Sequence, residues 1–94
     1  MERDKVLDAV KSLICGDRDV QYGSPATNFA VSADLWKAYC RQRFGPTINF
    51  EASDVASMMA LFKIARIAAD SGKEDSWLDA IGYLACGAEV AGEY

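Results

Sequence analysis

Basic side chains stand at helical spacing in one apolar segment of the chain, near residue 60. Lys63, Arg66 and Asp70 fall on one narrow stripe, because a helix turns about 100° per residue. The surrounding residues 55–69 are apolar almost all the way round, which is typical of a helix that is buried on most sides. Arg66 therefore either extends its aliphatic stem outward or has an anionic partner, because an unpaired buried charge is strongly unfavourable.

Acidic side chains follow at the same kind of spacing near residue 80. Asp75 and Asp79 share a stripe, with Tyr83 beside it. A short turn between the two segments makes them antiparallel neighbours. Counting from that turn places Asp79 near Arg66, and Tyr83 near Phe62 or Lys63. Three interpretations follow: a structural ion-pair network, a polar pocket for a charged small molecule, or an exposed stripe that contacts a protein. In the pocket, the two carboxylates would hold a divalent cation.

A third group of candidate residues lies in the connector at residues 17–29. Arg18 is suited to a phosphate, Tyr22 to stacking on a base and Asn28 to a base edge. The alternative is a well-capped turn in which Tyr22 and Phe29 pack inward.

The composition excludes several kinds of chemistry. The chain has no histidine, which removes Ser-His and Cys-His catalysis and imidazole metal sites. A metal would need carboxylates, which suits Mg²⁺ or Mn²⁺. The net charge of −4 disfavours nonspecific binding to nucleic acid. Three widely spaced cysteines predict small core residues in a reducing compartment, and the absence of a long apolar run argues against a membrane span, so we expect a cytoplasmic protein.

The elements that position these residues are four predicted helices in a single domain, 1–94. They cover about residues 3–15, 25–43, a third segment ending near Asp70, and about 75–91. Ser24 before Pro25 is a strong start signal, and Gly45-Pro46 is a break. The third helix has Thr47, Asn49 or Ser53 as candidate caps. The sequence thus predicts an all-α four-helix bundle. It also predicts a homo-oligomer, because so short a chain cannot bury all of its apolar surface.

Several short motifs, taken together, resemble a family of small phage and prophage proteins of unknown function. They include Tyr22-Gly23-Ser24-Pro25, Lys63-Ile64-Ala65-Arg66 and Asp75-Ser76-Trp77-Leu78-Asp79 with Gly82-Tyr83. The resemblance spans nearly the whole chain. It implies a viral origin and action in the cytoplasm of a bacterial host cell.

A more distant similarity is to MazG-like all-α nucleotide pyrophosphohydrolases and to phage domains associated with nucleotide modification. Those proteins are oligomeric helical bundles in which acidic residues hold magnesium against nucleotide phosphates. The resemblance implies such a role for Asp75 and Asp79. A Glu-x-x-Glu pair, the first acidic element of those enzymes, is absent from this chain.

Two hypotheses of function follow. In the first, the chain binds a nucleotide or cyclic nucleotide, either as a divergent pyrophosphohydrolase or as a protein that sequesters the ligand. Arg18, Lys63 and Arg66 would then contact phosphates, Tyr22 or Tyr83 the base, and Asp75 and Asp79 the ribose or Mg²⁺. In the second, a non-enzymatic phage protein blocks a host factor, such as a defence or CRISPR component, through its surface.

Overall fold

The computed structural model describes residues 1–16 and 23–92, and all regular structure in them is helical. The helices are α1 (Arg3–Ile14), α3 (Pro25–Phe44), α4 (Ala52–Ala69) and α5 (Glu74–Ala91). Within the described residues, the all-α prediction with four helices is confirmed, and each predicted segment ends within a few residues of the observed helix.

Local signals explain most of the helix ends. The Ser24 hydroxyl accepts a hydrogen bond from the Thr27 N–H at 3.2 Å, and Pro25 occupies the first turn of α3. At the other end of α3, Gly45 has a φ of 130°, a conformation that side-chain-bearing residues rarely adopt.

The predicted caps of α4 were wrong. The residue before α4 is Glu51, whose N–H donates to the Asp54 carboxylate at 2.7 Å, so neither Thr47, Asn49 nor Ser53 is the cap. The reciprocal Glu51–Asp54 arrangement replaces them as the start signal. Helix α5 begins one residue before Asp75, and Ser76 lies buried inside it.

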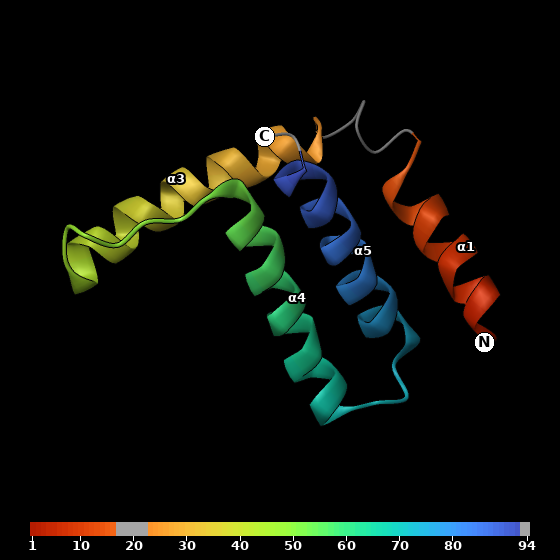
Figure 1. Cartoon of the computed structure of the whole chain (residues 1–94). Coiled ribbons are helices and arrows are strands. Elements are labelled where there is room, and N and C mark those ends of the chain that lie inside the picture. Colours follow the sequence, from red (N-terminus) through yellow and green to blue (C-terminus); the bar gives the residue numbers. More distant parts are fainter. Residues whose placement is uncertain (17–22, 93–94) are drawn as a thin grey trace.

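The helices form a layer of three with the fourth across its end (Figure 1). Helices α4 and α5 are an antiparallel hairpin with the most extensive contacts in the molecule, and α1 packs on α5. Helix α3 crosses the ends of α4 and α5 and extends beyond α4 as an arm (Figure 1). The arrangement is therefore more open than an up-and-down bundle.

The buried core of this single chain consists of small side chains. Its apolar members are two valines and four alanines, and the described part of the chain has no large side chain that is fully buried. Trp77 is not part of this core, because its side chain is 48% exposed. The buried apolar side chains are Val10, Ala33, Val55, Ala56, Ala60 and Ala80.

Helix α4 departs most clearly from its prediction. Leu61, Phe62 and Ile64 are 63%, 51% and 50% exposed, although the sequence predicted a helix buried on most sides. The cysteines are not core residues either, since Cys15 is exposed and Cys40 and Cys86 are only half-buried. Among the described residues, no helix combines the length and apolar character needed to cross a membrane.

Candidate functional site

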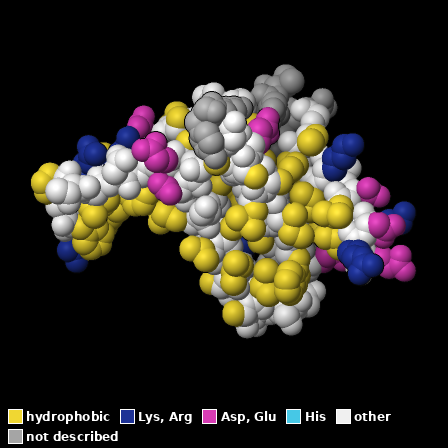
Figure 2. All heavy atoms as spheres, in the orientation of Figure 1, with side chains coloured by type: hydrophobic (Ala, Val, Ile, Leu, Met, Phe, Trp, Pro, Cys, Tyr) yellow, Lys and Arg dark blue, Asp and Glu magenta, His cyan; other side chains and the backbone are white. Residues whose placement is uncertain are grey.

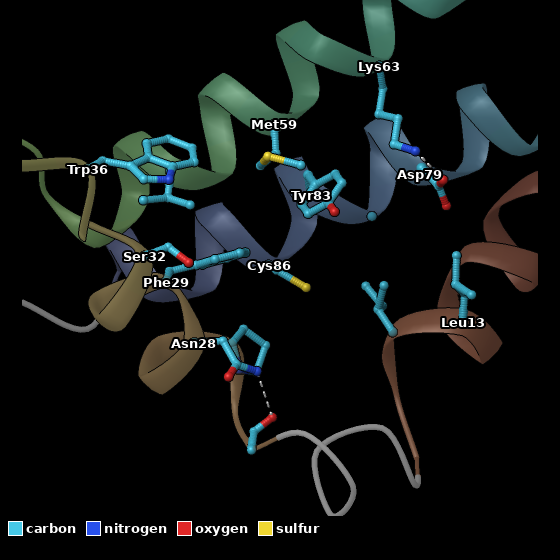
Figure 3. A pocket seen from close by; sticks show the side chains of 15 residues that line it. Leu13, Asn28, Phe29, Ser32, Trp36, Met59, Lys63, Asp79, Tyr83 and Cys86 are labelled. Carbon is cyan, nitrogen blue, oxygen red and sulfur yellow. Dashed lines mark hydrogen bonds and ion pairs between the residues drawn. The ribbon is translucent and has the colours of Figure 1, made fainter. Parts of the chain in front are cut away.

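A cleft of about 550 Å³ opens where all four helices meet (Figure 3). The end of α1, the first half of α3 and the facing sides of α4 and α5 form its walls. Its volume lies within the range of about 300–1,000 Å³ that is typical of small-molecule sites. The lining residues are Leu13, Ile14, Gly23, Pro25, Asn28, Phe29, Ser32, Trp36, Val55, Met59, Lys63, Asp79, Gly82, Tyr83 and Cys86.

An ion pair stands in the wall between α4 and α5. The Lys63 Nζ lies 2.9 Å from the Asp79 Oδ2, and the two side chains are 17% and 33% exposed (Figure 3). A lysine ammonium has three N–H donors, so this contact leaves it with further donor capacity toward the cleft. The pair is only partly desolvated, and its contribution to folding is therefore modest.

The predicted pair between Arg66 and Asp79 is wrong, because Lys63 occupies that place. Arg66 is exposed, and its guanidinium lies 5.1 Å from the centre of the Phe62 ring. The outward-reaching stem considered from the sequence is thus the observed arrangement. Arg66 and Asp75 do not line the cleft.

Aromatic side chains form much of the apolar lining. The rings of Phe29 and Tyr83 lie 6.5 Å apart at an interplanar angle of 39°, which joins α3 to α5. Trp36 packs edge-on against Phe50, with ring centres 5.9 Å apart. These contacts hold the flat apolar surfaces of Phe29, Trp36 and Tyr83 in the same cleft as the Lys63–Asp79 pair.

Asn28 adds an amide to the rim of the cleft. Its Nδ2 donates to the Gly23 carbonyl at 3.4 Å, which leaves its Oδ1 outside that contact (Figure 3). The structure thus brings together four of the predicted site residues: Asn28, Lys63, Asp79 and Tyr83. Arg18 and Tyr22, predicted for the same ligand, lie outside the described residues.

The acidic residues provide few ligands for a metal. Asp79 is paired with Lys63, and Asp75 lies one turn earlier on α5 and outside the cleft. Across residues 1–16 and 23–92, no three Cys, Asp or Glu side chains gather at one point as metal ligands. A Mg²⁺ ion commonly binds through one or two carboxylates together with substrate phosphates. Asp79 is the carboxylate that lines the cleft, and one of its oxygens already contacts the Lys63 ammonium.

Sequence reasoning missed the apolar half of the cleft. Phe29, Trp36 and Met59 have the spacing of inward-facing helical residues, and that spacing is as typical of a closed core as of a cleft. The Asn28-Phe29 pair directly after the Ser24-Pro25 start signal was the available clue. It places an amide and a ring in the first turns of one helix.

Comparison with known proteins identifies the relatives of the chain. A domain of unknown function, DUF6378, matches residues 5–91. The Gene 55 protein of Mycobacterium phage D29 is 34% identical over 83 residues, which are 88% of this chain and 51% of the relative. The Gene 55 protein of Mycobacterium phage L5 is 36% identical over 78 residues, 83% of this chain and 47% of the relative.

The chain thus spans about half the length of these curated relatives. No solved structure is significantly similar to it. The relatives support the expected family of small uncharacterised phage proteins, whereas the likeness to MazG-like enzymes stays a prediction. Because the family model covers nearly the whole sequence, the chain belongs to the DUF6378 family.

Proposed function

We propose that this protein binds a nucleotide in the cleft between its four helices. The observation that carries the proposal is that the aromatic side chains Phe29, Trp36 and Tyr83 line the same cavity of about 550 Å³ as the Lys63–Asp79 pair. A nucleotide combines a flat base with a sugar and an anionic phosphate, and this cleft offers surfaces for each of them.

The base would lie against the aromatic wall. Stacking of a base on an aromatic side chain contributes about 1–3 kcal/mol and tolerates any base, because every base has a π-face. Tyr83 and Phe29 present such surfaces, and Asn28 carries an amide that can pair with a base edge.

The phosphate would lie at Lys63. A phosphate oxygen accepts hydrogen bonds from an ammonium group, and Lys63 has donors beyond the one that Asp79 uses. Asp79 in turn holds the ammonium at the wall of the cleft and can accept a hydrogen bond from a ribose hydroxyl. This assignment keeps Lys63, Tyr83, Asn28 and Asp79 in the site and omits Arg66 and Asp75.

A thermal-shift series tests the proposal. Nucleoside mono-, di- and triphosphates and cyclic nucleotides are added one at a time, with and without Mg²⁺. A ligand present at about 100 times its Kd adds about 2.7 kcal/mol to the free energy of unfolding. We expect at least one nucleotide to stabilise the chain and the corresponding nucleoside to stabilise it less.

Matched variants locate the binding site. Lys63→Met removes the cleft ammonium, whereas Lys37→Met removes a lysine that pairs with Asp34 at 3.3 Å on α3, outside the cleft. We expect the nucleotide-dependent shift to be lost in Lys63→Met and kept in Lys37→Met. If no nucleotide shifts the melting temperature, or if the shift is equal in both variants, the proposal is wrong.

A further inference from the structure

Helices α4 and α5 each carry a regular apolar stripe on their exposed side. In both stripes the residues follow one another at intervals of four, three and four, which is the spacing of a coiled-coil seam. Leu61 and Ile64 are 63% and 50% exposed, and Trp77 and Leu84 are 48% and 52% exposed. The two stripes, together called the apolar face, are Ser57, Leu61, Ile64 and Ala68 on α4 and Trp77, Ile81, Leu84 and Ala88 on α5.

The apolar face lies on the side of the hairpin away from the cleft. On α5, Trp77 and Leu84 stand about 140–160° around the helix from Asp79, which lines the cleft. On α4, Leu61 stands about 160° from Lys63. The face and the cleft are therefore separate surfaces. Figure 2 shows hydrophobic side chains gathered over α4 and α5, whereas most charged side chains in this view lie over α1 and α3.

Trp77 is held in place on this face. Its indole Nε1 donates to the Ser71 carbonyl at 3.0 Å, so its polar atom is satisfied within the chain. The ring remains about half exposed in a fixed position. A rigid tryptophan with its polar atom already bonded is the kind of residue that dominates the binding energy of protein interfaces.

The accessible surface area of the chain indicates how much surface a binding partner could cover. Its accessible surface is 6704 Å², against about 5,300 Å² for a folded monomer of this mass. The excess of roughly 1,400 Å², to which the α3 arm also contributes, exceeds the ~800 Å² per partner of a standard interface. The radius of gyration, 14.6 Å, is likewise above the value of about 12 Å for a compact domain of this length.

We propose that a second copy of this chain covers the apolar face, so that two α4–α5 hairpins form a four-helix bundle. A two-fold dimer brings the same patch of both copies together. None of the eight residues of the face is charged, so two copies with a net charge of −4 each can meet there without like charges in contact. The nucleotide clefts would then open on the two outer sides of the dimer.

Sedimentation equilibrium of the wild-type chain from 1 to 100 µM tests the assembly. We expect a mass of twice 10.2 kDa and a melting temperature that rises with protein concentration. A mass of one chain throughout, with a melting temperature independent of concentration, would overturn the proposal. In that case the apolar face would be available to bind a different protein.

Two substitutions distinguish the apolar face from the other exposed stripe, which is Val31, Leu35 and Tyr39 on α3. Because a two-fold interface contains each change twice, Leu84→Lys should raise the dimer Kd on the order of 100-fold or more. Leu35→Lys should leave the Kd within a few-fold. The reverse pattern would place the interface on α3 and refute the assignment.

A spectroscopic readout covers the case in which Leu84→Lys fails to fold. In a Trp36→Phe background, the tryptophan fluorescence comes from Trp77 alone. We expect that emission to shift to the red and to become more open to acrylamide quenching as the protein is diluted. Unchanged emission across a measured dimer-to-monomer transition would show that Trp77 is outside the interface.

Discussion

A single methyl group added at Gly87 tests how closely α4 and α5 approach. A Cβ at this position would lie 2.7 Å from the Ala56 Cβ, whereas two carbon atoms pack at about 3.5–4.0 Å. The two helices would therefore have to separate by about 1 Å. Overpacking of this kind costs about 1–3 kcal/mol, and the higher helix propensity of alanine offsets about 1 kcal/mol of it.

The matched control is Gly82→Ala on the same helix. Its added Cβ would meet only the Ile14 Cγ2, at 3.1 Å, and Ile14 is the last residue of α1, where a shift of a few tenths of an ångström relieves the contact. Gly82→Ala should therefore keep most of the helix-propensity gain, about 0.5–1 kcal/mol.

Thermal unfolding at one fixed protein concentration compares the two variants. Gly87→Ala should melt below Gly82→Ala by about 4–8 °C for each kcal/mol of difference, and that difference should be about 1–3 kcal/mol. If Gly87→Ala is as stable as Gly82→Ala, the close approach of the helices at Ala56 is wrong.

Three further substitutions have defined outcomes in urea unfolding. Ser24→Ala removes the cap of α3 and should lower the free energy of unfolding by about 1 kcal/mol, since the Thr27 N–H loses its partner. Arg66→Met should change the free energy of unfolding by less than about 1 kcal/mol, because the guanidinium is exposed over Phe62. A loss of about 3 kcal/mol would instead indicate that Arg66 belongs to a buried ion pair. Lys63→Met should cost roughly 1 kcal/mol, and this loss should shrink at high salt; a loss independent of salt would exclude the ion pair as its cause.

The positions of the helices were predictable because strong local signals mark their ends. Ser24-Pro25 and Gly45-Pro46 bound α3, and both act through the backbone at the position where they stand. The cap of α4 was missed because glutamate is not a typical cap, and Glu51 acts only together with Asp54. The open arrangement was not predictable, because periodicity identifies an apolar face but not what covers it.

The candidate site was predictable up to the register of the hairpin. Facing positions of Lys63, Asp79 and Tyr83 follow from helical spacing, whereas the choice of Arg66 as the partner of Asp79 was one turn in error. The register is set by the close packing of Gly87 on Ala56, since the same alignment brings Lys63 opposite Asp79. The Gly87–Ala56 contact is possible because glycine has no side chain. The spacing of charged residues, from which the ion pair was predicted, carries no information about such a contact.

The measurement that tests nucleotide binding most directly is an NMR titration of ¹⁵N-labelled protein with the nucleotide that stabilises it most. We predict saturable shifts of backbone amides concentrated at Asn28, Lys63, Asp79 and Tyr83, which line the cleft from three helices. The amides of Leu61 and Trp77, on the opposite side of the hairpin, should move little. Shifts that do not saturate, or that gather on α4 and α5 away from the cleft, would contradict binding in the cleft.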